Sequence, residues 1–169
     1  MGVLDTISGW LSAPPPNLIY LVPTLAFFES CAGVGLFVSG VFLLSTTTLL
    51  YTTESASLTV IVMLGFSGAL LGDHSGYLVG RLLGGRVWHI TWLQNRKQTR
   101  ARVQAQLERS APMAICVGRL VPLLRSLTPI AAGVSGMSWR KYFACDVLAC
   151  AIWATGLSLI LTNLVLIPF

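Results

Sequence analysis

The stretch Gly118-Arg119-Leu-Val-Pro122-Leu-Leu-Arg125-Ser-Leu-Thr-Pro129-Ile-Ala-Ala-Gly133 carries two arginines inside an otherwise uncharged, largely apolar run. An ionisable side chain at bilayer depth costs about 2.5–3.5 kcal/mol on insertion scales, which makes it a candidate functional residue by default. The prolines remove backbone N–H donors and break helices. Cations beside broken backbone favour a binding site for an anion, with Arg119 and Arg125 as the binding residues. We therefore predict an integral membrane protein that handles an anionic group.

The composition of the chain is that of a membrane protein. Its 169 residues are 54% hydrophobic and 10% charged, whereas a soluble domain has about 25% charged residues. Uncharged runs cover residues 6–28, 30–53, 55–72 and 147–169, and each is about long enough to cross ~30 Å of hydrocarbon as a helix. We expect a single all-α membrane domain over residues 1–169. The first residues lack the basic stretch of a cleavable signal peptide, so we expect them to stay in the protein.

Positive charge is concentrated in one loop. The net charge is +5, and residues 81–109 contain seven basic residues against one acidic residue. Apolar runs on both sides make a juxtamembrane loop a better explanation than nucleic-acid binding. The positive-inside rule places this loop, residues 85–110, on the cytoplasmic side. There it would meet anionic lipid head groups.

The chain contains two similar halves. A Gly- and Thr-rich segment at about 30–53 precedes a crossing helix at about 56–84, and a proline-broken segment at about 112–137 precedes a second crossing helix at about 140–167. Interrupted segments in matching positions of two halves indicate a transport site built on inverted repeats. The basic loop places the end of the first crossing helix and the start of the second on the same side of the membrane. The two broken segments would therefore enter from opposite faces. We predict a helical bundle with two opposed re-entrant hairpins, although hydropathy also permits ordinary crossings.

The first crossing helix carries a stripe of small residues beside a polar stripe. A stripe of glycines lets another backbone pack closely, within one chain or between the subunits of a homo-oligomer. Asp73, Tyr77 and Arg81 recur at helical spacing beside it. Asp73 lies about eight residues from the basic end, too deep for its short side chain to reach the head groups. We expect it to face the bundle interior. The glycines recur every four residues: Gly68, Gly72, Gly76, Gly80 and Gly84.

Two motifs in the chain resemble those of the DedA family, the SNARE-associated or VTT-domain membrane proteins. Gly72-Asp73-His-Ser-Gly76-Tyr77-Leu-Val-Gly80-Arg81 resembles the family's Gly-Asp-x-x-Gly-Tyr-x-x-Gly-Arg motif. Residues 118–137 resemble its second motif, Arg-Phe-x-Pro-x-x-Arg-x-x-x-Pro-x-x-Ala-Gly followed by Met. Phe28-Glu29 resembles the family's Phe-x-Glu entry to the first hairpin. The resemblance extends from about residue 27 to residue 153.

The resemblance implies facing re-entrant hairpins and the translocation of a lipid, undecaprenyl phosphate or a phospholipid, across the bacterial cytoplasmic membrane. It implies essential roles for Glu29 and Asp73 as well as for the two arginines. Many members have a second acidic residue where this chain has Val41. Proton coupling here would therefore rest on Glu29 or Asp73, or be absent. The motif residues that would shape the site are Tyr77, Arg81, Pro122, Pro129 and Gly133.

A lipid phosphate suits this set of side chains. Arginine binds phosphate bidentately and remains protonated, and backbone N–H groups freed by the prolines would add donors. Glu29 and Asp73 would neutralise the arginines when no ligand is present. Protonating either carboxylate would release an arginine to the phosphate, which would couple phosphate binding to a proton.

Two other functions remain open: a proton-coupled exporter of small solutes or cations, and a non-transporting scaffold in which the arginines pair only structurally. Arg119 could also extend to the cytoplasmic head groups. We expect no enzymatic activity, metal or cofactor, because nucleophile–base spacing and metal-ligand spacing are missing from the sequence. His74 is expected to be a satisfied polar residue, and Asp146 a hydrogen-bond partner between helices.

Overall fold

The computed structural model describes residues 14–31, 40–87, 109–110, 113, 115–119, 125 and 127–166. These residues form helices and turns without a strand, which confirms the all-α class for the described part of the chain. Most of the predicted basic loop, Pro122 and residues 32–39 of the first predicted hairpin lie outside the described residues. The elements are the 3-10 helix η1 (Pro16–Tyr20) and the helices α2 (Leu21–Ser30), α3 (Gly40–Thr52), α4 (Leu58–Val87), α8 (Thr128–Val134) and α9 (Trp139–Leu166).

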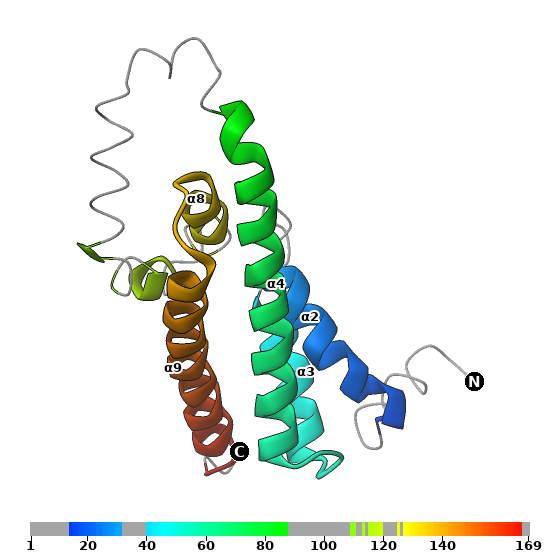
Figure 1. Ribbon diagram of the computed structural model, residues 1–169. Helices are drawn as coiled ribbons and strands as arrows, with labels where there is room; N and C mark the ends of the chain where they lie inside the picture. Colours follow the sequence, from blue (N-terminus) through cyan, green and yellow to red (C-terminus); the bar gives the residue numbers. More distant parts are fainter. Residues whose placement is uncertain are drawn as a thin grey trace.

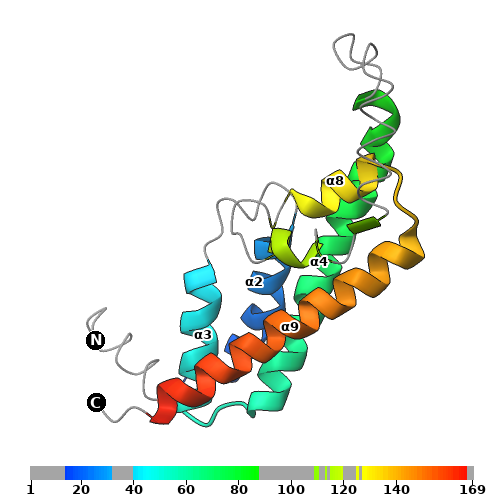
Figure 2. The same cartoon turned by 90° about the vertical axis from the view of Figure 1, so that its left-hand side faces the viewer.

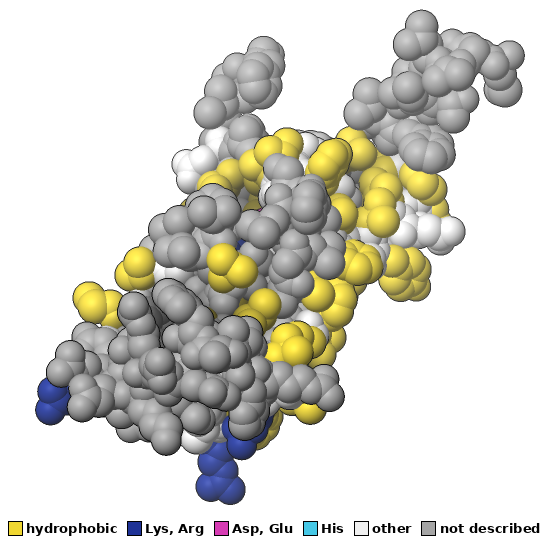
Figure 3. Space-filling view, turned by 90° about the horizontal axis from the view of Figure 1, so that it is seen from above, with side chains coloured by type: hydrophobic (Ala, Val, Ile, Leu, Met, Phe, Trp, Pro, Cys, Tyr) yellow, Lys and Arg dark blue, Asp and Glu magenta, His cyan; other side chains and the backbone are white. Residues whose placement is uncertain are grey.

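Two long helices, α4 and α9, form the frame of the molecule. Each contains a stretch long and apolar enough to cross a membrane, Leu58–Gly84 and Trp139–Asn163. They run in opposite directions, and α9 crosses α4 obliquely (Figures 1 and 2). Large apolar side chains such as Leu82 and Leu159 are exposed on them, and apolar side chains cover much of the described surface seen from above (Figure 3). Exposed apolar side chains on helices of this length fit a lipid environment.

The glycine stripe of α4 packs against two short helices of the same chain. A Cβ added at Gly68 or Gly72 would overlap the backbone of α2, and one at Gly80 would overlap the backbone of α8. Gly133 of α8 is equally close to the backbone of α4. Small residues allow this close approach in the absence of a hydrophobic driving force. The stripe therefore fixes α2 beside the first half of α4 and α8 beside the second half (Figure 1).

Local signals in the sequence set the ends of these helices. The backbone N–H of Val60 donates to Ser57 Oγ (3.4 Å) at the start of α4, as an N-cap does. Pro129 stands in the first turn of α8, where its missing N–H costs nothing. Gly136 has a φ of 79°, and the N–H of Met137 donates to the carbonyl of Ala132 (3.2 Å). This Schellman motif ends α8 and leads the chain directly into α9.

Two apolar clusters lie on either side of a buried polar centre. The first joins α2, α3 and the early part of α4 to the end of α9, and the second joins α8 and the later part of α4 to the start of α9. On α4, Asp73 lies between Ala69 of the first cluster and Tyr77 of the second. The buried polar or charged side chains near this level include Glu29, Ser30, Asp73, Arg119 and Asp146.

Candidate functional site

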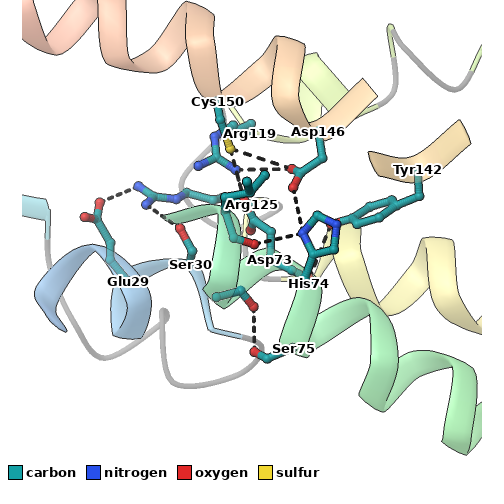
Figure 4. Close-up of polar contacts among 12 residues, drawn as sticks. Glu29, Ser30, Asp73, His74, Ser75, Arg119, Arg125, Tyr142, Asp146 and Cys150 are labelled. Atoms are coloured by element: carbon teal, nitrogen blue, oxygen red, sulfur yellow. Dashed lines mark hydrogen bonds and ion pairs between the residues drawn. The ribbon is translucent and has the colours of Figure 1, made fainter. Parts of the chain in front are cut away.

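Arg119 pairs with Asp73 in the middle of the bundle (Figure 4). Its Nη1 donates to Asp73 Oδ2 and lies 3.6 Å from Asp146 Oδ1 on α9. All three side chains are buried. Arg119 thus points into the interior of the bundle. A buried guanidinium is tolerated when carboxylates compensate its charge, and removing one partner is strongly destabilising.

Arg125 pairs with the end of α2. Its Nη1 donates to Glu29 Oε1, and its Nη2 donates to Ser30 Oγ at 3.1 Å. Glu29 and Ser30 are the last two residues of α2, which the glycines of α4 hold in place. The structure therefore brings together all four charged residues that the sequence indicated, as two arginine–carboxylate pairs.

Trp153 of α9 lies next to both arginines. Its ring centroid is 5.6 Å from Arg125 Cζ and 5.9 Å from Arg119 Cζ. A cation over an indole face gains about 0.5–2 kcal/mol, more when desolvated. Sequence reasoning missed Trp153, although its spacing of seven residues from Asp146 places the two on one face of α9.

Asp146 and His74 extend the cluster beyond the predicted residues. His74 Nδ1–H donates to the carbonyl of Leu70 (2.9 Å) and lies 3.4 Å from Asp146 Oδ2. Asp73, Asp146 and Cys150 hold potential metal-ligand atoms within 4.8 Å of one another. Arg119 contacts both carboxylates, so its guanidinium supplies the positive charge at this position. Asp146 is thus part of the charge cluster, a role that the sequence analysis did not assign to it.

Several polar atoms of the cluster have no hydrogen-bond partner among the described residues: Glu29 Oε2, Arg119 Nε and Nη2, and Arg125 Nε. A buried donor without a partner costs about 1–3 kcal/mol, so the arginines have capacity for another acceptor. The cavity between the arginines, Asp73 and Asp146 measures about 10 Å³, room for about one water molecule. The arginines are thus neutralised internally, and a larger anion would have to displace a carboxylate.

The predicted shaping residues occupy two different places. Tyr77 Oη donates to the carbonyl of Met137 (2.6 Å), and Arg81 Nη1 donates to Tyr77 Oη (2.8 Å). This pair fastens the turn between α8 and α9 to α4 and does not contact the paired arginines. Pro129 lines the small cavity, whereas Gly133 packs against α4.

Comparisons with known proteins agree with the motifs. The family model described as the VTT domain matches residues 16–163. A membrane protein of Mycobacterium leprae is 29% identical over 146 residues, covering 86% of this chain and 63% of its own length. The inner membrane protein YabI of Escherichia coli K12 is 26% identical over 132 residues, covering 78% of this chain and 52% of its own.

Protein DedA of Escherichia coli K12 is 28% identical over 102 residues, covering 60% of this chain and 47% of its own. This chain therefore spans about half to three-fifths of the length of the curated relatives that it matches. No solved structure matches it.

Proposed function

The chain belongs to the DedA family of VTT-domain membrane proteins, and from this premise we propose that it moves a phosphate-bearing lipid across the cytoplasmic membrane. The lipid is a polyprenyl phosphate or a phospholipid. The observation that carries the proposal is the pair of buried arginines beside one tryptophan. Each is held by a carboxylate, and each has N–H groups without a partner among the residues that the structure describes.

The proposed binding step is an exchange of anions on the arginines. A phosphate offers negative charge and several acceptor oxygens, so it can replace Glu29 on Arg125 and Asp73 on Arg119 without leaving a bare guanidinium. The displaced carboxylate would then be a buried charge without a partner, which is costly. A proton taken up by that carboxylate removes the cost. Proton uptake would thereby favour phosphate binding, and proton loss would favour its release.

The arrangement of the short helices supports two opposed re-entrant hairpins. Helices α2 and α3 run in opposite directions beside the first half of α4, and α8 lies beside the second half (Figures 1 and 2). Glu29 comes from the first of these regions and Arg125 from the second, so their ion pair joins the two. With residues 85–110 on the cytoplasmic side, separation of this pair would open the site toward one face at a time.

A second candidate function is proton-coupled export of a cation. The donor set of Asp73, Asp146 and Cys150 favours it. The position of Arg119 between these carboxylates disfavours it, because a cation would enter against the guanidinium charge.

The test is lipid translocation by the purified protein in liposomes, with a fluorescent polyprenyl phosphate and a fluorescent zwitterionic phospholipid as probes. We expect the wild type to move at least one probe and Arg125→Ala to abolish the movement. Arg125→Lys should restore only part of it, since an ammonium lacks the bidentate geometry. Arg140→Ala, at an exposed position of α9, is the control and should behave as the wild type.

Each outcome has a meaning for the proposal. Movement of the polyprenyl phosphate alone identifies a carrier-lipid transporter, and equal movement of both probes identifies a scramblase. Movement of neither probe by the wild type, under any imposed pH gradient, would refute lipid transport.

A further inference from the structure

An apolar groove leads away from the arginine pairs between α3 and α9. It has a volume of about 420 Å³, within the range of about 300–1,000 Å³ typical of ligand pockets. Leu43 and Leu44 line one wall, and Leu157 and Ile160 line the other. Ile160 is 48% exposed, so the groove is open on the outer surface of the bundle, where lipid would surround it.

One end of this groove is charged. Glu29 and Trp153 line it, and both contact Arg125. Glu29 is only 8% exposed, and its Oε2 has no hydrogen-bond partner among the described residues. From Trp153 to Ile160 the groove follows α9 for about 10 Å at 1.5 Å per residue. The groove therefore has a charged end followed by an apolar wall, which matches the charged head and the apolar tail of an amphiphile.

We propose that one hydrocarbon tail of the transported lipid lies in this groove while its phosphate lies at Arg125. The inference rests on the proposed function and adds a tail-binding site to it. A tail gains little free energy by leaving lipid for an apolar wall, because the two surroundings are equally apolar. The groove therefore orients the lipid, so that its phosphate approaches Arg125 laterally from within the bilayer.

Gly156 provides a way to block the groove without disturbing the fold. It lines the groove, and a Cβ added there meets nothing within 4 Å. The Cβ of a larger side chain therefore has space at this position, and we expect the rest of that side chain to extend into the groove. Gly40, at the charged end, is unsuitable because its Cβ would lie 2.6 Å from Glu29 Oε1.

The experiment combines translocation with crosslinking in liposomes. The probe is a polyprenyl phosphate with a photoactivatable group in its tail, and the protein is the full chain as wild type, Gly156→Phe or Leu148→Phe. Leu148 is 53% exposed on the same helix and is not among the residues that line the groove. We expect wild-type crosslinks on Leu43, Leu44, Leu157 or Ile160. Gly156→Phe should lower both crosslinking and translocation about tenfold, with an unchanged melting temperature, while Leu148→Phe changes neither.

The two proposals fail in distinguishable ways. If the wild type translocates the probe and Gly156→Phe does so equally, with crosslinks spread over the outer faces of α4 and α9, the groove inference is wrong and transport stands. If crosslinks concentrate in the groove and are lost in Gly156→Phe, but the wild type moves no lipid, the tail site stands and transport is wrong.

Discussion

Arg119 faces two carboxylates, whereas Arg125 faces one. With the three carboxylates and the two arginines ionised and His74 uncharged, the cluster of Asp73, Asp146, Glu29 and the two arginines holds one excess negative charge. A lipid phosphate would enter against that excess unless one carboxylate takes a proton. Because of this excess charge, phosphate binding should depend on protonation of a carboxylate more strongly than it would if each arginine faced a single carboxylate.

Asp146→Asn removes the excess charge and keeps the volume of the side chain. We expect the lipid-phosphate concentration for half-maximal translocation to fall about threefold to tenfold, which corresponds to about 0.7–1.4 kcal/mol. The dependence on an imposed pH gradient should weaken as well. Cys150→Ala, a neighbouring change without loss of charge, should leave both unchanged. A rise in the half-maximal concentration for Asp146→Asn would show that Asp146 serves the site in another way.

Trp153→Leu removes the aromatic face beside both arginines and retains an apolar wall. Translocation should fall about tenfold, because a cation–π contact is worth about 0.5–2 kcal/mol. Trp153→Phe keeps a weaker aromatic face, so an intermediate rate is expected in the same liposome assay. Equal rates for the Leu and Phe variants would indicate that the indole only fills space.

The charged residues could be predicted from the sequence because each interrupts an uncharged run. An ionisable side chain there is costly to insert into a membrane, which marks it as a candidate functional residue. Asp146 and Trp153 could not be assigned in the same way. A single aspartate near the start of an apolar helix has several common roles, and a tryptophan has more. Only the packing of α9 against α4 distinguishes between these roles.

At the scale of the elements, the site depends on how closely α2 and α8 approach α4. These helices carry or adjoin residues from both arginine pairs, and their distance from α4 is set by glycines that leave no room for a Cβ. The spacing of the glycines predicted a packing stripe. The sequence did not identify the helices that pack against this stripe, because a glycine carries no information about which backbone lies against it.

Gly68→Val and Gly80→Val should each lower the midpoint of thermal unfolding. Overpacking of this kind costs about 1–3 kcal/mol, or roughly 2–12 °C for a chain of this size. Gly156→Ala is the matched control, since space is open at that position, and it should leave the midpoint unchanged or slightly raised. Unfolding in detergent, followed by circular dichroism, measures all three. Unchanged midpoints for both valine variants would contradict the close packing of α4.

The charge cluster lies near the middle of the long helix α4. Asp73 stands 15 residues after Leu58 and 14 before Val87, so it is about 21–23 Å from either end of α4. The two motifs and the alternation of broken and apolar segments sufficed to predict the family, and the match confirms it. Hydropathy shows which segments are apolar but not from which side of the membrane the short helices enter, so the sequence could not fix that orientation.

Cysteine labelling tests the sidedness. In a variant with the four native cysteines replaced by alanine, Ser55→Cys, in the turn before α4, should react only with reagent on the outer side. Gln104→Cys, in the basic loop, should react only from the cytoplasmic side, because α4 crosses the membrane between the two positions. Labelling of both from one side would contradict the crossing.

On the proposed function, the buried arginines bind a phosphate and do more than join helices. The most direct test is translocation of the polyprenyl phosphate probe and of the zwitterionic phospholipid probe by the double variant Glu29→Gln/Arg125→Gln, with its unfolding midpoint measured in parallel. Two amides can retain a hydrogen bond between the end of α2 and the segment before α8, so the fold should persist with a midpoint within a few degrees of the wild type. We predict a folded protein that no longer moves either lipid. A folded double variant that translocates at the wild-type rate would contradict the account.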